Sequence, residues 1–260
     1  MSFKVCIPSL HREKIIKKHT LSTLLQKGIN PEQIDIWVAD NQEKKKYTDS
    51  IPSEMYNKIY VGSLGRMNQL NHIRKFYPQK SKILIIDDDI SKIETIDEDK
   101  HLIPAENLDL WSDFVFKKMN KFKSGICGIY KVRNGLFMDK SITVGYCYIF
   151  GAMHWIINNQ TPKLNLFLDV CEDYETTIKN YVYYGKTMNC NALSVKNESW
   201  DNENIQRMEN PTKNSQAHKK LTKAYPDLIY TKDNRLLIYR KEKKRYPFSE
   251  GTFRRLQDGN

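Results

Sequence analysis

The sequence predicts an α/β fold in which a mixed, mostly parallel central sheet is flanked by helices. Two observations lead to this prediction. In the first ninety residues, apolar runs that suit buried strands alternate with segments whose apolar residues recur at helical spacing. The second half holds shorter apolar or alternating runs with many aromatic residues, a pattern typical of a partly antiparallel sheet.

The first half contains four predicted strands, at residues 3–7, 34–39, 59–61 and 83–86. Two helices are predicted, one ended by Gly28 and one opened by Gly65 and Arg66, at residues 13–27 and 66–76. Residues 42–53 are polar and are predicted to form a loop. Because strand, helix and strand in succession indicate a right-handed crossover in a parallel sheet, residues 1–92 are expected to form a nucleotide-binding half.

Residues 93–229 are expected to form an acceptor half of the same domain. Its predicted helices lie at 110–121 and 174–184, and its predicted strands at 125–132, 142–149 and 165–170. The polar segment 201–217 is predicted to be a mobile loop of the kind that closes over active sites. Residues 230–260 are expected to be a basic C-terminal extension of this domain.

Composition limits the function classes. The formal net charge of +11 favours a polyanionic partner such as nucleic acid, although solubility alone would also explain it. The five cysteines form no CxxC pair, which argues against a zinc site or a disulfide framework and indicates a reducing cytoplasm, that of the host cell if the protein is viral. No signal peptide or bilayer-spanning stretch is evident, so no membrane partner is expected. No protein partner is predicted either.

Three consecutive acids follow the last strand of the first half. Asp87, Asp88 and Asp89 would emerge at the carboxyl end of a parallel strand, where open α/β sheets bind ligands. Adjacent carboxylates repel one another unless a cation is present, so Mg²⁺ or Mn²⁺ is the natural partner. A solvated turn after a strand is the alternative interpretation.

Polar or turn-forming residues at other strand ends would meet these acids at one edge of the sheet. They are Pro8, Ser9, Asp40, Gly65 and Arg66. A short acid can accept hydrogen bonds from ribose hydroxyls or a base N–H, and Arg66 can neutralise a phosphate. A metal held by Asp87 and Asp89 can bridge two phosphates. The pattern therefore suits a nucleoside diphosphate.

The C-terminal residues 232–255 carry nine basic residues against three acidic ones, with four aromatic residues interleaved. A basic run is usually a solvated face, but the interleaved aromatics favour binding to a phosphate backbone. The residues expected to contact DNA are Lys241, Lys243, Lys244, Arg245, Arg254 and Arg255.

The order of these motifs resembles the GT-A fold glycosyltransferases, whose Rossmann-like sheet carries a DxD motif at a strand end. Residues 85–90, with the sequence IIDDDI, look like that motif. Residues 7–12 (IPSLHR), 37–40 (WVAD) followed by Tyr47, and 65–68 (GRMN) are similar to the TET-associated glycosyltransferases and to phage enzymes that glycosylate hydroxymethylcytosine. The resemblance covers roughly residues 3–90.

The resemblance implies a UDP-sugar as donor, Mn²⁺ or Mg²⁺ as cofactor, and inversion at the sugar. Asp173, beside Glu172, looks like the catalytic base. His218 would be a third metal ligand with Asp87 and Asp89, or else a surface histidine on a polar helix. Arg12 would contact a phosphate or pair with a nearby acid. The nucleotide-sugar ligands that the resemblance implies are Pro8, Ser9, Arg12, Asp40, Gly65, Arg66, Asn68, Asp87 and Asp88.

The resulting hypothesis is transfer of glucose or arabinose from a UDP-sugar to 5-hydroxymethylcytosine, or to an already glycosylated derivative, in duplex DNA during phage DNA hypermodification. The modified base would be flipped out of the duplex while the basic extension holds the backbone. Three alternatives stay open. They are a glycosyltransferase with a glycan, protein or small-molecule acceptor, a metal-dependent nuclease or nucleotidyltransferase, and a non-catalytic DNA-binding module.

Overall fold

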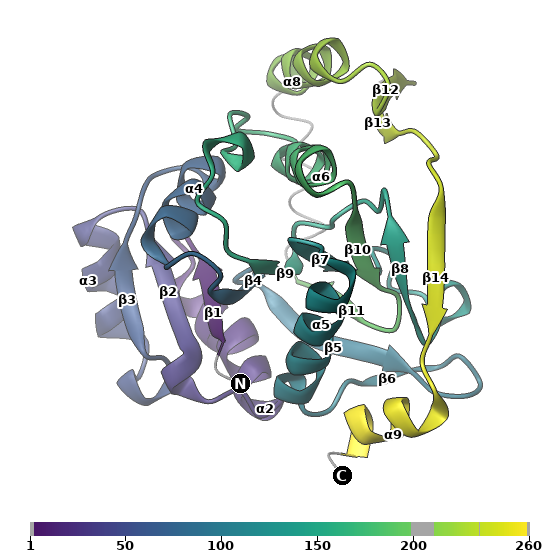
Figure 1. The fold of residues 1–260 in the computed structure, drawn as a ribbon. Coiled ribbons are helices and arrows are strands. Elements are labelled where there is room, and N and C mark those ends of the chain that lie inside the picture. The colour runs from purple at the N-terminus through teal and green to yellow at the C-terminus, as the bar shows by residue number, and fades with distance from the viewer. Residues whose placement is uncertain (1–2, 199–210, 234, 259–260) are drawn as a thin grey trace.

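A nine-stranded sheet forms the centre of the molecule, with strand order β14-β8-β10-β7-β9-β4-β1-β2-β3 (Figure 1). The computed structural model describes residues 3–198, 211–233 and 235–258. The strands of this sheet are β1 Lys4–Pro8, β2 Ile34–Val38, β3 Lys58–Val61, β4 Lys82–Ile86, β7 Ile126–Ile129, β8 Ser141–Gly145, β9 Met153–Ile157, β10 Thr187–Cys190 and β14 Lys243–Pro247. The predicted mixed α/β fold is confirmed.

The strands β1 to β4 are parallel, which the crossovers of the first half predicted. β1 lies between β2 and β4, and β4 pairs on its other side with the antiparallel strand β9. β4 has four buried aliphatic residues in succession, as expected for a strand covered on both faces. Its carboxyl end delivers the acid triplet to the middle of the sheet edge.

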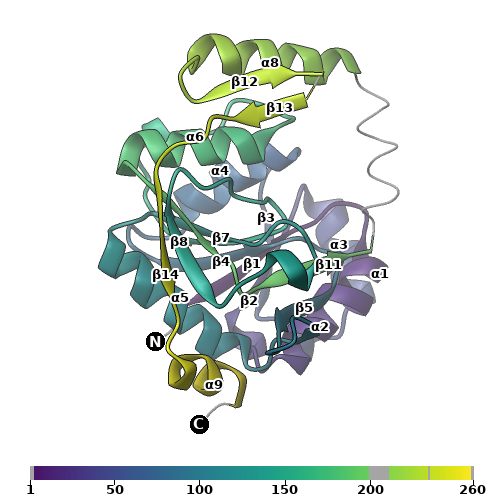
Figure 2. The same ribbon diagram turned by 90° about the vertical axis from the view of Figure 1, so that its right-hand side faces the viewer.

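Helices cover both faces of the sheet. Figure 2 shows α4 and α6 over one face and α2 and α5 over the other, with α8 and the β12–β13 hairpin forming a further layer outside α6. The helices are α1 Glu13–Ile16, α2 Ser22–Gln26, α3 Asn41–Ser50, α4 Arg66–Phe76, α5 Leu108–Phe122, α6 Glu172–Tyr184, α8 Pro211–Ala224 and α9 Glu250–Asp258. A π-helical turn, Lys17–Leu21, joins α1 to α2.

Two smaller sheets complete the fold. The strands β5 Ile90–Ile96, β6 Leu102–Pro104 and β11 Ser194–Asn197 form one antiparallel sheet in the order β11-β5-β6. The strands β12 Ile229–Lys232 and β13 Arg235–Ile238 form the other. β11 brings residues near 197 beside the start of β5, immediately after the acid triplet.

The predicted loop at residues 42–53 is wrong, because α3 occupies most of it. The Asp40 carboxylate accepts hydrogen bonds from the backbone N–H groups of Gln42 and Glu43, at 2.8 and 2.9 Å, and so caps the helix N-terminus. Only Glu43 and Tyr47 of this helix are buried. A helix with so few apolar residues shows little helical periodicity in its sequence.

The predicted strand at residues 165–170 is also wrong. The backbone N–H groups of Phe167 and Leu168 bond to the Glu175 carboxylate, at 2.9 and 3.0 Å, instead of to a neighbouring strand. Further along the chain, α8 shows that residues 211–217 are helical, so the predicted loop 201–217 is wrong over its second part. Residues 201–210 of that prediction lie outside the described residues.

The C-terminal residues complete the main sheet. β14 pairs with β8 as an edge strand, and β12 begins at Ile229, across the predicted boundary between residues 229 and 230. Phe253 and Leu256 of α9 are buried in the main core, where Phe253 packs against Trp111 of α5. The division into a domain and an extension stays a prediction.

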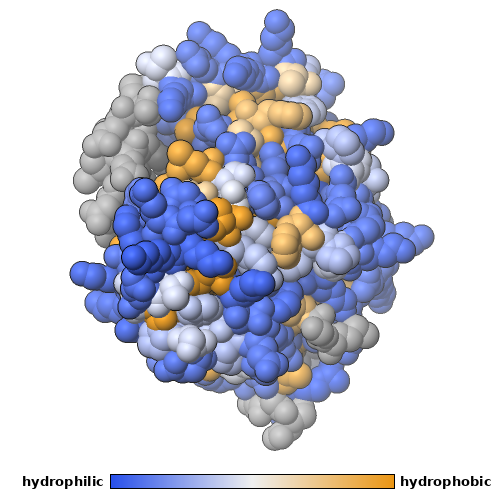
Figure 3. Space-filling view, turned by 90° about the vertical axis from the view of Figure 1, so that its left-hand side faces the viewer, coloured by the Kyte–Doolittle hydropathy of each residue, from blue (hydrophilic) through white to orange (hydrophobic). Residues whose placement is uncertain are grey.

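Figure 3 shows the face on the side of α3 and β3. Hydrophilic side chains cover most of it, and hydrophobic residues form separate groups between them. No helix among residues 3–198, 211–233 and 235–258 is long and apolar enough to cross a membrane.

Candidate active site

The three acids that follow β4, Asp87, Asp88 and Asp89, form a turn that we call the acid turn. Hydrogen bonds from backbone groups and from a hydroxyl group fix its position. The Thr20 hydroxyl in the π-helical turn donates to the Asp87 carbonyl at 2.7 Å and accepts from the Ile90 N–H at 2.9 Å. The Asp87 N–H donates to the Ala152 carbonyl at 2.9 Å. These bonds fix the backbone on both sides of the three carboxylates, so each carboxylate has its own direction and its own partners.

Asp87 faces Arg66 at the start of α4. The Arg66 Nη1 atom lies 2.5 Å from Asp87 Oδ1, Nε lies 3.7 Å from Glu172 Oε1, and Nη2 donates to the Gly151 carbonyl at 3.0 Å. Burial and the neighbouring acids raise the pKa of Asp87 to about 7, although Arg66 acts in the opposite direction. Burial alone would lower the pKa of Arg66, but Asp87 and Glu172 outweigh it and raise that pKa. Arg66 therefore joins the acid triplet to the start of α6.

Asp88 points toward the end of β1. Its carboxylate accepts hydrogen bonds from the Ser9 hydroxyl at 2.6 Å and from Arg12 Nη1 at 3.1 Å. Ser9 also shares a 2.6 Å hydrogen bond with the Tyr47 hydroxyl. Burial raises the pKa of Asp88, and the bonds from Ser9 and Arg12 offset part of that rise. Of the two predicted roles of Arg12, pairing with an acid is the one present in this structure.

Asp89 is buried and faces β11. Asn197 Nδ2 donates to Asp89 Oδ1 at 3.1 Å, and Arg12 Nη1 lies 3.7 Å from Asp89 Oδ2. The backbone N–H of Glu198 donates to the Asp89 carbonyl at 3.0 Å. Asn197, more than one hundred residues away in the sequence, is thus part of the acid turn.

The acid turn fits a divalent cation in its donor chemistry. Asp87 and Asp89 offer hard carboxylate oxygens, and the neighbouring acids add to the effect of burial in raising the pKa values of Asp87 and Asp88. In the part of the chain that the structure describes, no three His, Cys, Asp or Glu side chains are grouped to hold a metal. His218 lies half-buried on α8, beside the apolar layer outside α6. Its role as a ligand stays a prediction.

Asp173 and Glu172 begin α6, after a left-handed Cys171 at φ 63°. The Tyr148 hydroxyl donates to Asp173 Oδ2, and the Tyr174 backbone N–H donates to Asp173 Oδ1 at 2.8 Å. Burial and the Asp173 charge raise the pKa of Tyr148, so Tyr148 stays a neutral donor. Both oxygens of the predicted catalytic base are therefore held in a defined orientation.

A small cavity of about 10 Å³ lies between Arg66 and these two acids. Its wall includes Gly151, where an added Cβ would lie 3.7 Å from Asp173 Cβ and 3.9 Å from Glu172 Oε1. The lining residues are Arg66, Leu70, Ile149, Gly151, His154, Glu172, Asp173 and Thr176. The predicted donor-side arginine and the predicted catalytic acids thus share one cavity.

The other predicted donor-site residues lie at the same edge but are engaged in local structure. Pro8 ends β1, Asp40 caps α3, and Asn68 donates to the Leu64 carbonyl at 3.0 Å. Gly65 precedes α4 at φ 90°, a conformation that a side chain would strain. None of these contacts tests nucleotide binding, which stays a prediction for all four.

The predicted DNA-binding residues are exposed, but they are not gathered at the acid turn. Lys243, Lys244 and Arg245 lie on the edge strand β14, and Lys241 immediately precedes it. Arg245 pairs with Asp139 at 2.7 Å, and Arg254 of α9 pairs with Glu250. Arg255 is exposed next to Arg254. β14 lies five inter-strand spacings away from β4 in the sheet, which corresponds to about 24 Å.

Two residues whose side chains contact the acid turn were not predicted from the sequence. Thr20 and Asn197 contact it from a π-helical turn and from β11. A threonine in an apolar helix and an asparagine at a strand end are common in any sequence. Only the long-range pairing of the elements brings them to the acids.

The acids at the carboxyl end of a central parallel strand, the flanking helices and the added antiparallel strands define a GT-A type fold. S. aureus TarS residues 1–349 in complex with UDP-GlcNAc superpose with a TM-score of 0.50 at 16% identity, covering 75% of this chain and 57% of that one. A further S. aureus TarS structure gives a TM-score of 0.48 at 16% identity, covering 86% of this chain and 44% of that one.

Glucosyl-3-phosphoglycerate synthase from Mycobacterium tuberculosis, in complex with Mn²⁺, UDP-glucose and phosphoglyceric acid, gives a TM-score of 0.49 at 11% identity. The match covers 96% of this chain and 88% of the synthase. The chain spans little more than half the length of the TarS fragment that it resembles. No family of known proteins matches the sequence, and no curated protein matches it either.

Proposed function

We propose that this protein is a metal-dependent glycosyltransferase that uses a UDP-sugar as donor. The observation that carries the proposal is the position of Arg66, which contacts the acid turn through Asp87 and the start of α6 through Glu172. A donor diphosphate bound at the acid turn and an acceptor hydroxyl at Asp173 would then be neighbours. The similarity in fold to TarS, which binds UDP-GlcNAc, supports this reading.

The donor would lie along the carboxyl ends of β1, β2 and β4. Pro8, Ser9 and Asp40 would line its nucleoside side, and Arg66 and Arg12 would turn from their acids toward the phosphates. Gly65 and Asn68 would line the turn before α4. Asp87 and Asp89 would hold Mn²⁺ or Mg²⁺, which supplies positive charge next to the diphosphate when bound.

In the transfer step, Asp173 would take the proton of the acceptor hydroxyl while that oxygen forms a bond to the anomeric carbon. The bond from this carbon to the UDP oxygen breaks, and the configuration inverts. UDP leaves with the bonding electron pair, and Arg66 stabilises its charge. Tyr148 would keep Asp173 oriented through its hydrogen bond.

For the acceptor, we propose 5-hydroxymethylcytosine in duplex DNA, bare or already glycosylated, with glucose or arabinose as the sugar and a role in phage DNA modification. Support comes from the net charge of +11 and from the exposed basic residues of β14 and α9. A separation of about 24 Å between β14 and β4 corresponds to roughly seven base pairs along a duplex. One duplex could therefore reach both elements while a flipped base enters the site.

The test is to incubate the protein with hydroxymethylcytosine DNA, Mn²⁺ or Mg²⁺ and a panel of UDP-sugars, and to weigh the digested nucleosides by mass spectrometry. A gain of one hexose or pentose on the modified base is the expected result. UDP release with no change in the DNA would indicate that the acceptor is a glycan, a protein or a small molecule instead. DNA cleavage without any donor would favour a nuclease and overturn the proposal.

A further inference from the structure

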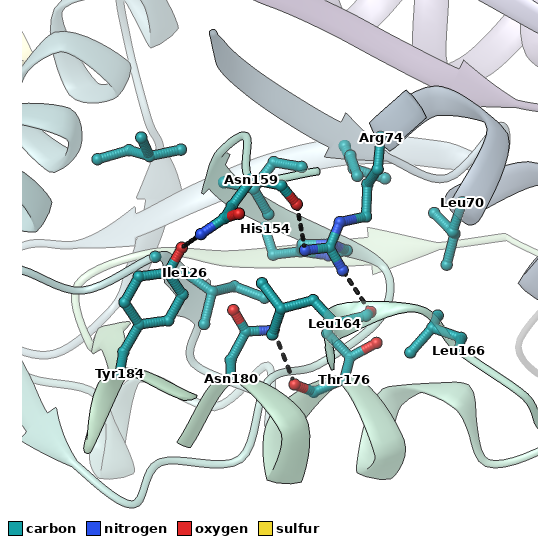
Figure 4. Close-up of a pocket in the computed structure, with 14 residues that line it drawn as sticks. Leu70, Arg74, Ile126, His154, Asn159, Leu164, Leu166, Thr176, Asn180 and Tyr184 are labelled. Atoms are coloured by element: carbon teal, nitrogen blue, oxygen red, sulfur yellow. Dashed lines mark hydrogen bonds between the residues drawn. The ribbon is translucent and has the colours of Figure 1, made fainter. Parts of the chain in front are cut away.

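A second cavity lies behind the candidate active site, between α4 and α6. It has a volume of about 30 Å³, and residues of β4, β7 and β9 line it on the side of the sheet (Figure 4). It adjoins the cavity at Asp173, with which it shares Leu70, His154 and Thr176. Its other polar lining residues are Arg74, Asn159, Asn180 and Tyr184. None of these four has a part in the proposed transfer.

The far end of this cavity holds a positive charge without a counter-charge. Arg74 Nη1 donates to the Leu164 carbonyl at 2.5 Å, and Nη2 donates to the Asn159 carbonyl at 3.0 Å. Figure 4 shows the guanidinium pointing into the space between the two helices. No carboxylate of the described residues pairs with it, whereas Arg66, Arg12 and Arg133 each pair with at least one acid.

The electrostatic setting of Arg74 agrees with this geometry. Burial lowers the pKa of Arg74 to about 10, and Tyr184 offsets only a small part of the effect. Arg74 still carries its charge at neutral pH. Burial and the charges of Arg66 and Arg74 together lower the pKa of His154 to about 3, so this histidine is neutral and adds no charge of its own.

Two further polar groups of the lining have unused hydrogen-bonding capacity. The Tyr184 hydroxyl accepts from Asn159 Nδ2 at 3.0 Å, which leaves its own proton available to a ligand. His154 is 4% exposed, and its Nδ1 atom is buried without a hydrogen-bond partner among the described residues. A buried nitrogen of this kind normally has a partner, either in the protein or in a bound water or ion.

We propose that this cavity binds a small oxyanion, a carboxylate or phosphate group, through Arg74 and Tyr184. A planar guanidinium with free N–H groups is the usual protein ligand for such a group. Water molecules alone would fill the space, since about 10–15 Å³ suffices for one water, but they would leave the half-buried charge of Arg74 without a counter-charge. A cavity of about 30 Å³ is too small for a nucleotide, which restricts the ligand to a small anion.

The oxyanion could be a free ion or the acidic group of an acceptor whose hydroxyl lies at Asp173. The proposal does not depend on glycosyl transfer, because binding to Arg74 is measurable in the protein alone. Arg74 of α4 already donates hydrogen bonds to the carbonyls of Leu164 and Asn159, in the chain before α6. An anion bound to Arg74 would therefore add a further link between these two segments.

The test is a titration of the full chain with sodium formate, and separately with inorganic phosphate, followed by NMR of arginine Nε–Hε groups. The Arg74 signal, assigned with the Arg74→Lys variant, should shift and saturate. The Arg133 signal should not move, because that guanidinium is already paired with Glu94. Absence of a saturable shift at Arg74 with both anions would overturn the proposal.

Tyr184→Phe is the matched variant, because it removes one proposed donor and keeps the ring that packs on Gly125. It should weaken formate binding about tenfold to a hundredfold, the loss expected for one hydrogen bond to a charged group. Tyr183→Phe, on the exposed side of the same helix, should leave binding unchanged. Equal affinities for all three proteins would also count against the site.

Steady-state kinetics of sugar transfer in the presence of formate distinguish the two sources of the anion. Formate that competes with the acceptor identifies an acidic acceptor group, and formate that alters turnover without competing identifies a free ion. If no sugar transfer is found at all, the proposed function fails while the NMR result still decides the anion site.

Discussion

The Nη1 atom of Arg66 lies 2.5 Å from Oδ1 of Asp87, and each side chain is one-quarter exposed. This pair closes the acid turn on the side of α6. A bound diphosphate would compete with Asp87 for Arg66, and a metal would compete with Arg66 for Asp87. We therefore expect the pair to separate if the proposed donor and cation bind together.

Replacing either member of this pair should abolish transfer but affect stability unequally. Arg66→Met leaves Asp87 and Glu172 without their cation, whereas Asp87→Asn leaves Arg66 with Glu172 and the Gly151 carbonyl. We expect kcat/KM to fall by about a hundredfold or more in both variants. We expect Arg66→Met to cost roughly 1–3 kcal/mol more free energy of unfolding, after allowing for partial exposure. Urea unfolding of both proteins checks this, and equal losses would contradict it.

Tyr148→Phe should lower kcat and leave the KM of the UDP-sugar nearly unchanged. The variant removes the hydrogen bond to Asp173 Oδ2 but keeps the ring that packs on Tyr174. A freely rotating carboxylate would meet the acceptor proton less often, and we expect a loss of about tenfold to a hundredfold. Steady-state kinetics with Tyr183→Phe as control measure it. A change in KM alone would indicate that Tyr148 contacts the substrate instead.

Asp40→Ala separates the helix-capping role of this residue from nucleotide binding. Losing the cap of α3 should cost about 1 kcal/mol of stability. Asp40→Asn keeps a capping oxygen and should restore most of that loss. If Asp40 also contacts the donor, both variants should weaken UDP binding by calorimetry. Unchanged UDP binding would leave Asp40 with a structural role only.

His154 should make the protein less stable in mild acid. Its pKa in the folded state is about 3, below the ordinary 6.5 expected on unfolding, so the unfolded chain binds the extra proton between these values. This contribution to stability is complete above pH 6.5 and is lost as the pH falls toward 3, by at most about 1.4 kcal/mol per pH unit. Chemical unfolding of wild type and His154→Gln between pH 7 and 5 checks it, since the variant should show the flatter slope.

Neutralising Lys243 and Lys244 together should weaken DNA binding in a salt-dependent way. If each contacts one phosphate, the slope of log K against log salt should fall by about 0.9 per contact. A double Lys18→Gln and Lys45→Gln variant has the same charge change at exposed positions elsewhere and is the control. Equal effects of both double variants would show that only the overall charge matters.

The parallel half of the fold was predictable because its signals are local. The apolar runs of β1 to β4, and Gly28 at φ 78°, each act within a few residues of their own position. The helix α3 was missed because its stability comes from the Asp40 cap and two buried residues, which leave almost no periodicity. The strand predicted at residues 165–170 failed because Glu175, a helical side chain, satisfies its backbone.

The candidate site was predictable to a similar degree. Asp87, Asp88, Arg66 and Ser9 were identified from strand-end positions, and the structure brings them into contact. Their pairwise partners were not predictable, since Ser9 and Asp88 are 79 positions apart in the sequence. Tertiary packing, which no local pattern records, decides which arginine meets which acid.

The π-helical turn Lys17–Leu21 has a consequence for how this chain tolerates change. A π turn holds one more residue than the α-helical turn it replaces, so deleting one residue there would restore regular winding. All residues on one side of the deletion would rotate by about 100° relative to the other side. Thr20 would then lose its hydrogen bonds to the Asp87 carbonyl and the Ile90 N–H. A single-codon deletion in this turn should therefore disturb the backbone of the acid turn, although the helix that carries the deletion has no catalytic group of its own.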